Sequence, residues 1–340
     1  MRKVIVEEAV GLALGHDITE IVPDKGIKHR AFRRGHVVAA GDVERLKDLG
    51  KNAVYILEEG DTEVHEDDAA LEVAPLVGGP NILADAEPYE GKITFRAACD
   101  GLFTVDVERL FAINSLAIPA LPTIPIDYPV KAGHTVAAFR IIPLSCPREI
   151  IDQVVAQLAV PLLEVHPYLL KTAAVVVTGS EVYEGRIEDR FVPRITETLL
   201  PYGVQVIESL ILPDDRPRIA ETVARLIDAC DIVFVTGGTS VDPDDVTVLA
   251  MQDAGVQYEV KGMPIQPGNN FTIGYSGETP VCAVPAATLF YRATALDVFL
   301  PRLLAGRRIT REEIHRMGHG GLAQPGAEES FPDCTFGRSR

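Results

Sequence analysis

Paired cysteines and long apolar runs are both missing from this chain of 340 residues. Its five cysteines are Cys99, Cys146, Cys230, Cys282 and Cys334. They are scattered and never spaced as a metal-binding pair, which predicts reduced and mostly buried thiols. The longest apolar runs fall well short of a bilayer span, and the N-terminus shows no cleavage-type signal region. We therefore expect a cytoplasmic protein with no membrane partner.

Basic residues are also scarce, because 32 Lys and Arg stand against 49 Asp and Glu. The resulting net charge of −17 opposes nonspecific binding to nucleic acid or to anionic membranes, so we expect no nucleic-acid partner. An anionic ligand must then be held by local donors, such as backbone N–H groups at a strand-to-helix turn.

The stretch DIVFVTGGTSVDPDDVT, residues 231–247, combines the features expected of such a turn. A buried strand at 232–235 is followed by Gly237 and Gly238, which allow a sharp turn and a close approach to a ligand. An acidic cluster and a helix at 248–254 come next. The glycine pair alone is equally compatible with a tight turn, whereas the acids that follow favour a ligand site.

Two further turns of this kind occur in the second half of the chain. A strand at 173–177 precedes TGSE, and a strand at 281–284 precedes PAA and a long helix to about residue 304. Another strand, at 204–212, precedes PDD, in which Asp214 or Asp215 is also well placed as a helix N-cap. Alternation of strand and helix predicts a mostly parallel sheet with helices on both faces. The turns after residues 177, 235 and 284 should then open on one sheet edge.

The predicted fold class is therefore α/β, with smaller regions before the C-terminal sheet. An N-terminal α+β region is expected at 1–60, with strands at 3–6, 37–39 and 54–57 and a helix at 42–49. A β-rich middle domain follows at 61–148, with strands at 92–97, 102–107 and 135–142. The remaining expectations are a linker helix at 149–170, the α/β domain at 171–305 and a tail at 306–340, whose Gly-rich part from Gly318 to Arg340 should be disordered or lie on the surface.

Two groups in the first half allow more than one interpretation. A basic cluster is either a solvated face or a contact for an anionic ligand, on this chain or on a partner subunit; it comprises His29, Arg30, Arg33, Arg34 and His36. His65, next to three acids at 66–68, either takes part in a metal site or lies at a solvated helix start.

Five motifs occur in an order and spacing that resemble one known family: TGSEVYEGRIEDRF, ILPDD, DIVFVTGGTSVDPDDVT, QPGNNFTIGY and VPAATLF. Together they are similar to the molybdopterin-binding domain of molybdopterin adenylyltransferases and molybdotransferases. The resemblance covers residues 171–305, and residues 1–60 look more weakly like pieces of the molybdotransferase.

The resemblance implies a site for a small-molecule pterin ligand, formed by the turns. The implied ligand-binding residues are Thr178, Gly179, Ser180, Glu181, Thr236, Gly237, Gly238, Thr239, Ser240, Asp242, Pro285 and Ala286. Asp214 and Asp245 match the acidic positions associated with activity, and Asp242 and Asp245 would hold Mg²⁺. The implied chemistry is adenylyl transfer to molybdopterin or molybdate insertion into its adenylate, with ATP or AMP involved. The family also implies a homo-oligomer, either a dimer or a trimer.

The sequence departs from the family pattern at two places. VPAAT at residues 284–288 replaces the usual Leu-Pro-Gly-Asn-Pro turn, and Gln266 and Asn269 replace lysines beside Pro267-Gly268. These changes remove cations and favour a second interpretation, a non-catalytic carrier or sensor of the cofactor. A third is a nucleotide pyrophosphatase of the competence-damage type, whose related domain shares the TGG and DD pattern.

Overall fold

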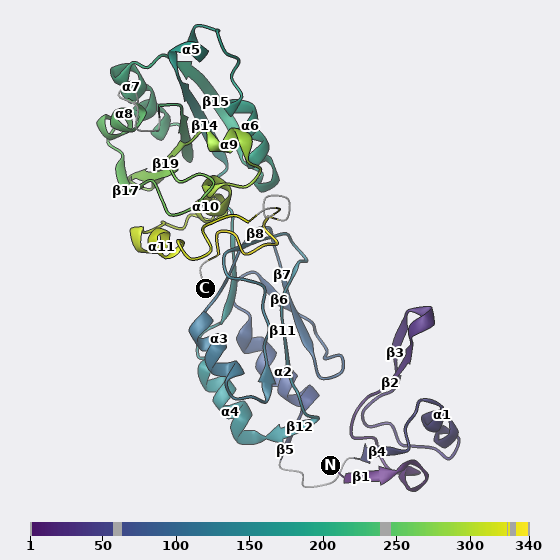
Figure 1. Cartoon of the computed structure of the whole chain (residues 1–340). Helices are drawn as coiled ribbons and strands as arrows, with labels where there is room; N and C mark the ends of the chain where they lie inside the picture. Colours follow the sequence, from purple (N-terminus) through teal and green to yellow (C-terminus); the bar gives the residue numbers. More distant parts are fainter. Residues whose placement is uncertain (1, 57–62, 239–245, 325, 327–330, 339–340) are drawn as a thin grey trace.

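The computed structural model describes residues 2–56, 63–238, 246–324, 326 and 331–338, and Figure 1 shows the chain as an elongated series of bodies. The N-terminal region lies at one end, a middle body in the centre and the α/β body at the other end. Each has its own hydrophobic core. Two expectations from the composition can be compared with this structure. Among the described residues, no helix is long and apolar enough to cross a membrane. Cys99, Cys146, Cys230 and Cys282 are free thiols, and the last three of these are buried, as predicted.

The N-terminal region is a small α+β unit with a projecting hairpin. Its elements are β1 (Arg2–Ile5), η1 (Val6–Ala9), β2 (Ile18–Val22), η2 (Pro23–Lys25), β3 (Ile27–Phe32), α1 (Asp42–Asp48) and β4 (Ala53–Ile56). β1 pairs antiparallel with β4, and Leu14 and Leu46 are fully buried in the core. The hairpin of β2 and β3 was not predicted, since its strands carry many polar residues. The strand expected at 37–39 is wrong; only an isolated bridge between Ala13 and Val37 forms there.

The middle body contains three small sheets and three helices. Its elements are β5 (Glu63–His65), α2 (Glu66–Val77), β6 (Ile82–Ala84), β7 (Ile93–Ala97), β8 (Gly101–Val105), α3 (Val107–Asn114), β9 (Pro119–Ala120), β10 (Tyr128–Val130), β11 (Thr135–Ile141), β12 (Ser145–Pro147), α4 (Arg148–Gln157) and β13 (Leu163–Pro167). The strand orders are β10-β8-β13, β6-β7-β11-β9 and β12-β5. Phe95, Phe103 and Phe139 are fully buried between these elements.

The segment expected to act as a linker helix is part of this middle core. Ile151 and Val154 of α4 have no exposed surface and pack in the same cluster as Phe103. β13 then pairs antiparallel with β8, with Leu163 opposite Val105. Apolar residues on one face of α4 can be buried only against another element, and here the middle sheets provide it.

The α/β body is built on one six-stranded sheet with the strand order β15-β14-β16-β19-β18-β17. Its strands are β14 (Thr172–Thr178), β15 (Gln205–Leu212), β16 (Ile232–Thr236), β17 (Gln257–Lys261), β18 (Thr272–Ser276) and β19 (Thr279–Val284). β15, β14, β16 and β19 run parallel, β18 pairs antiparallel with β19, and β17 pairs antiparallel with β18. The predicted α/β class is confirmed, and the sheet is mixed.

Helices cover both faces of this sheet. They are α5 (Ser180–Tyr183), α6 (Phe191–Leu199), α7 (Arg216–Ile227), α8 (Thr247–Asp253), α9 (Ala287–Phe290), α10 (Ala295–Leu304) and α11 (Arg311–Arg316), with η3 at Leu200–Tyr202. Val175 and Val177 of β14 face α6 and α10, whereas Ala174 and Val176 face α7 and α8. Because side chains alternate along a strand, a strand covered on both faces is almost wholly apolar.

The long helix expected from Pro285 is instead divided into α9 and α10. Thr294 begins α10 with a capping box, in which its hydroxyl lies 3.1 Å from the Asp297 carboxylate and its N–H donates to that group at 2.8 Å. The cap fixes a new helix start, since its backbone is extended rather than helical.

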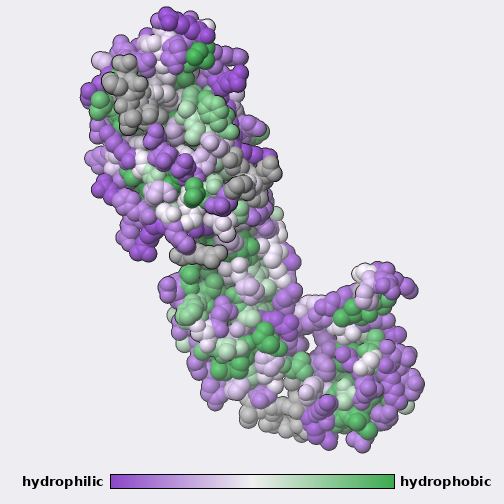
Figure 2. Space-filling model, in the orientation of Figure 1, coloured by the Kyte–Doolittle hydropathy of each residue, from purple (hydrophilic) through white to green (hydrophobic). Residues whose placement is uncertain are grey.

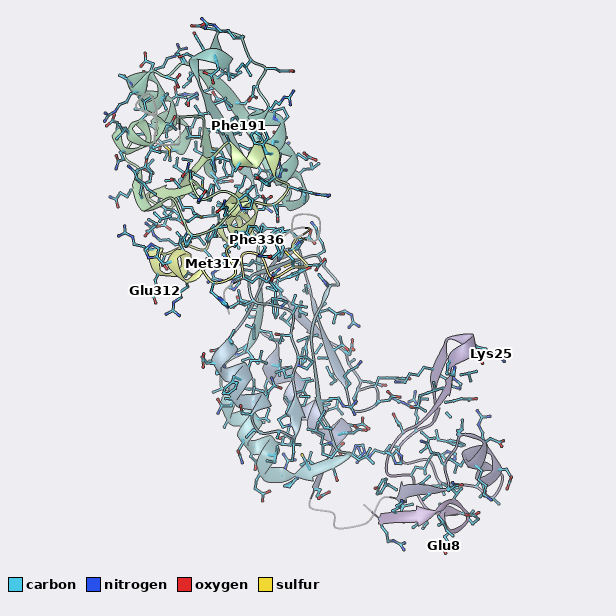
Figure 3. All side chains as sticks on the ribbon, viewed as in Figure 1. Glu8, Lys25, Phe191, Glu312, Met317 and Phe336 are labelled. Atoms are coloured by element: carbon cyan, nitrogen blue, oxygen red, sulfur yellow. The ribbon has the colours of Figure 1, made fainter. Side chains whose placement is uncertain are left out.

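The C-terminal tail joins the α/β body to the middle body. Phe336 is 2% exposed in the core that includes α10, and Figure 3 labels it where the two bodies meet. Arg338 lies 4.8 Å over the Tyr128 ring of β10 and donates to the carbonyl of Ile126. The hydroxyl of Tyr128 in turn bonds Asp333. Residues 331–338 therefore lie against both bodies, and the side chain of Phe336 enters the core of the α/β body.

The N-terminal hairpin contacts the middle body through polar groups. Arg34 binds both carboxylate oxygens of Asp68 at 3.0 and 2.9 Å, and Lys28 lies 2.7 Å from Glu90. Arg30 donates to the carbonyl of Pro88 at 3.1 Å. Half-exposed ion pairs each contribute little and are screened by salt, so this junction should weaken as the ionic strength rises.

Glu66 lies close to this junction, and its side chain is 7% exposed. Burial raises the pKa of Glu66 to about 6, although Arg140, whose Nη2 is 3.0 Å from Glu66 Oε2, acts in the opposite direction. Burial also lowers the pKa of His16 and of His65.

We predict that Phe336→Ala lowers the free energy of unfolding by about 3 kcal/mol, because it leaves a cavity in a close-packed core. Phe111→Ala is the matched control, since Phe111 is 70% exposed, and it should change stability by less than about 1 kcal/mol. Urea denaturation of both variants measures the difference. Equal effects would show that the tail does not pack as described.

We predict that Glu66→Gln gains stability relative to the wild type as the pH rises from about 4.5 to about 7. Because the pKa of Glu66 is raised in the folded state, protonation of Glu66 stabilises the wild type at low pH. This stabilisation is lost as the pH rises through about 6, whereas glutamine has no proton to release. The relative change should be about 2 kcal/mol. Denaturation of both proteins across this pH range tests it, because the histidines titrate alike in both; a constant difference would refute the prediction.

Candidate functional site

Four parallel strands end side by side at one edge of the α/β sheet. Thr236 at the end of β16 lies opposite Val177 of β14 and Val284 of β19. Thr178 at the end of β14 lies opposite Leu212 of β15. The turns after residues 177, 235 and 284 therefore leave from one edge, as the sequence predicts, and the PDD segment joins them.

The two glycine turns touch each other. Gly237 has φ +82°, and a Cβ at this position would lie 2.0 Å from the carbonyl oxygen of Thr178. The Thr178 hydroxyl donates to the carbonyl of Thr236 at 3.0 Å and lies 2.9 Å from the Thr247 hydroxyl of α8. Only glycine permits this approach, which brings the TGSE and TGG segments and α8 into one unit.

Asp214 connects the PDD segment to the TGSE turn. One of its carboxylate oxygens accepts from the Ser180 N–H at 2.8 Å and from the Ser180 hydroxyl at 3.0 Å. Asp215 instead caps α7 by accepting from the Arg218 N–H at 3.1 Å. The alternative left open by the sequence is thus resolved, because Asp215 is the N-cap and Asp214 faces the predicted site.

Part of the predicted site lies outside the described residues: Thr239, Ser240, Asp242 and Asp245, with the neighbouring Asp244. Among the residues that are described, no group of three or more His, Cys, Asp or Glu is arranged to hold a metal ion. The Mg²⁺ site expected at Asp242 and Asp245 therefore remains a prediction.

Two threonines near the edge are buried: Thr236, which was among the expected ligand-binding residues, and Thr288, which was not predicted. Thr236 and Thr288 are fully buried, and within the described part of the chain their hydroxyl oxygens have no hydrogen-bond partner. Thr236 lies two residues after Phe234 and so faces the same side of the sheet, where α6 and α10 pack. Buried hydroxyls without partners are uncommon in folded proteins, and nothing in the sequence pattern identifies them.

The third turn accommodates its departure from the family pattern without strain. Ala286, in place of glycine, has φ −57° and ψ −24°, an ordinary right-handed conformation. The Pro285 carbonyl accepts from the Thr288 N–H at 3.1 Å, so α9 begins directly after β19. The methyl group of Ala286 alters the surface offered to a ligand and leaves the backbone path intact.

A cavity of about 610 Å³ lies away from this edge, between α6, η3 and the segment around α9. None of the predicted site residues lines it. Its Arg194 already donates to the carbonyls of Thr288 and Arg292, at 3.1 and 2.9 Å, and to the Thr198 hydroxyl at 2.8 Å. This guanidinium holds α6 against the chain after α9, which is a structural role.

The basic cluster in the N-terminal region is largely neutralised within the chain. Arg30 lies 2.6 Å from Asp17, Arg34 binds Asp68, and His36 lies 2.7 Å from Asp42. Hydrogen bonding to Arg34 lowers the pKa of Asp68, and hydrogen bonding to His36 lowers that of Asp42. These contacts support neither a solvated face nor a contact for an anionic ligand, because the basic groups pair with acids of the same chain.

His65 is neither a solvated residue nor part of a described metal group. It is 5% exposed and is the N-cap of α2, where its Nδ1 accepts from the Asp67 N–H at 3.1 Å. The acids of the first helical turn are therefore placed by a buried histidine cap.

Comparison with known families agrees with the motifs. A family model described as a probable molybdopterin binding domain matches residues 174–305. This part of the chain is a domain of the molybdopterin-binding family, as the sequence motifs predict. A second model, described as a domain of unknown function, matches residues 3–58.

Curated relatives match shorter stretches. A CinA-like protein of Mycobacterium marinum is 38% identical over 186 residues, which is 48% of this chain and 44% of that protein. A CinA-like protein of Citrifermentans bemidjiense is 32% identical over 106 residues, or 31% of this chain and 26% of that protein. The chain thus spans less than half the length of either relative.

Solved structures are more distant. The molybdopterin biosynthesis enzyme MoaB from Thermus thermophilus is 17% identical, with a TM-score of 0.32, and the match covers 41% of this chain and 98% of that one. A molybdopterin biosynthesis MoeA protein from Pyrococcus horikoshii is 15% identical, with a TM-score of 0.32, and the match covers 89% of this chain and 74% of that one.

We predict that Gly237→Ala destabilises the protein more than Gly255→Ala. Both glycines have a left-handed backbone, with φ +82° and +88°, but a Cβ at Gly255 meets nothing within 4 Å. The shared backbone strain should cost about 1–2 kcal/mol in each variant, and the clash at Thr178 should add at least as much to Gly237→Ala alone. Urea midpoints measured side by side test this; equal midpoints would mean that the two turns do not touch.

Proposed function

We propose that the α/β body binds molybdopterin or its adenylate at the shared strand edge and acts in molybdenum cofactor biosynthesis. One observation carries the proposal: the Gly237 turn packs directly on the Thr178 carbonyl, while Asp214 is bonded to Ser180 in the same turn. These contacts bring the TGG, TGSE and PDD segments together at one point. In the proposal, backbone N–H groups of the glycine turn at this point bind the phosphate of a pterin side chain.

The charge of the chain supports backbone donors as the anion-binding groups. A protein with a net charge of −17 repels a phosphorylated ligand at long range, so attraction has to come from groups in contact with it. In this proposal Thr236 to Ser240 hold the phosphate, and Thr178 to Glu181 line the same pocket. Pro285 and Ala286 close the third side.

Within this site Asp214 acts as a positioning residue for the Ser180 turn. Its described hydrogen bonds all go to Ser180, which fixes the TGSE segment against the end of β15. Asp242 and Asp245 would hold Mg²⁺, which when bound supplies neutralisation of phosphate charge. The reaction proposed is adenylyl transfer from ATP, or molybdate insertion with release of AMP. Both depend mainly on positioning and electrostatic stabilisation.

Two other functions have observations in their favour. A non-catalytic carrier or sensor is favoured by Gln266 and Asn269, because uncharged amides at these positions offer less stabilisation to a phosphate or molybdate anion. The relatives named CinA-like protein match part of the chain and keep a nucleotide pyrophosphatase of the competence-damage type as a further candidate. A homo-oligomer, dimer or trimer, is part of the proposal for the enzyme.

The deciding experiment incubates the purified chain with molybdopterin, Mg-ATP and molybdate and follows the products. Pyrophosphate release dependent on molybdopterin indicates adenylyl transfer. AMP release that requires both molybdate and adenylated cofactor indicates insertion. Binding of molybdopterin without either product supports the carrier, and hydrolysis of a nucleotide without any pterin supports the pyrophosphatase. Failure to bind molybdopterin at all would refute the proposal.

We predict that Asp245→Asn lowers Mg²⁺-dependent turnover at least about 100-fold and changes molybdopterin affinity by less than about threefold. The loss of one carboxylate removes a metal ligand but none of the backbone donors that hold the phosphate. Asp228→Asn, at the exposed C-terminal end of α7, is the control and should leave both values unchanged. A similar loss of binding and turnover in Asp245→Asn would contradict this role.

A further inference from the structure

A second cavity, of about 330 Å³, lies between the segment at 266–269, the start of α9 and the C-terminal segment. Among the described residues, those that line it carry no formal charge: Gln266, Pro267, Gly268, Asn269, Ala287, Tyr291, Leu322, Ala323 and Gln324. Such a lining favours an uncharged ligand group over an ion.

The C-terminal segment is held in place as one wall of this cavity. The Gln266 N–H donates to the Gly321 carbonyl at 2.7 Å, and the Ala323 N–H donates to the Gln266 carbonyl at 2.9 Å. Gln266 thereby forms a parallel bridge with Leu322. A Cβ at Gly321 would lie 2.2 Å from the carbonyl oxygen of Pro264, so the segment cannot be packed more closely. These contacts determine the position of Gln324 beside the cavity.

The opposite wall connects the cavity to the sheet edge. Ala287 lines the cavity and begins α9 three residues after Val284, which lies opposite Thr236 in the sheet. On the remaining side, the Pro267 carbonyl accepts from the Ala295 N–H at 3.1 Å and attaches the loop to the start of α10. The cavity thus adjoins the third of the turns at this sheet edge, the one after β19.

The side chains around the cavity match one ligand chemistry. Carboxamides present a donor and an acceptor together and can pair with the edge of a heterocycle, as Asn and Gln do with adenine. Tyr291 is 44% exposed and Leu322 is 62% exposed, so each offers apolar surface to a planar ring. Gln266, Asn269 and Gln324 provide the amides.

We propose that this cavity is a subsite for the neutral, planar, amide-edged heterocycle of the ligand, and that Gln324 of the C-terminal segment determines its specificity. The inference rests on the proposed function for the position of the ligand's phosphate at the Gly237 turn. It differs from that function in assigning the ring to a place where the family pattern has cations, and in making the C-terminal segment part of the site. A pterin and a purine share this chemistry, and the experiment separates them.

The test measures binding of phosphate-free 6-hydroxymethylpterin, of adenosine and of molybdopterin to the full chain. Gln324→Leu keeps a similar size and removes the amide, so it should weaken binding of the preferred phosphate-free heterocycle about tenfold, as expected for one lost hydrogen-bonded pair. Gln153→Leu, an exposed glutamine of α4, is the matched control and should have no effect. Because Gln324 is exposed, unfolding midpoints of both variants should stay near that of the wild type.

The results separate the two proposals. Weaker binding of 6-hydroxymethylpterin to Gln324→Leu supports a pterin subsite, and the same result with adenosine supports a purine subsite, even if molybdopterin itself fails to bind. Two outcomes overturn the subsite and leave the proposed function standing, and in both the wild type binds molybdopterin. In the first, Gln324→Leu does not change ligand binding; in the second, neither phosphate-free ring binds. If none of the three ligands binds, both proposals fail.

Discussion

The close approach of Gly237 to the Thr178 carbonyl is the contact on which the candidate site depends. It requires a residue without a Cβ and a left-handed backbone at the end of a fully buried strand. The Thr178 hydroxyl, shared between the Thr236 carbonyl and the Thr247 hydroxyl, then connects the same point to α8. Because two strands and a helix share these bonds, a ligand that contacts one glycine turn necessarily lies near the other.

The chain joins its three bodies by two kinds of contact. At the tail, Phe336 is buried in the core of the α/β body while Arg338 stacks on Tyr128 of the middle body, so apolar burial and ring packing resist salt. At the N-terminal hairpin, Arg34 with Asp68 and Lys28 with Glu90 are partly exposed pairs that salt screens. Figure 2 shows hydrophilic residues predominating on the visible face of the α/β body.

The residues that depart from the family pattern lie at two places in the α/β body. Ala286 keeps an ordinary helical backbone, and the amides of Gln266 and Asn269 border a cavity without formal charge. The C-terminal segment closes that cavity by pairing with both sides of the Gln266 peptide. The same residues that weaken the case for a metal-inserting enzyme thus favour recognition of a neutral ring.

Local pattern in the sequence was sufficient for the class of the α/β body, for most of its strands and for the convergence of its turns, because buried parallel strands read as continuous apolar runs. Resemblance to a family singled out Asp214 as an acidic position associated with activity, whereas its hydrogen bonds to Ser180 of the TGSE turn were seen only in the structure. The polar β2–β3 hairpin, the burial of Phe336 and the role of α4 were decided by tertiary contacts, and short-range periodicity carries no information about such contacts. The division between α9 and α10 follows instead from the local Thr294–Asp297 capping box, which the sequence analysis did not identify. The cavity beside Gln266 is the clearest case, since one of its walls comes from residues 322–324.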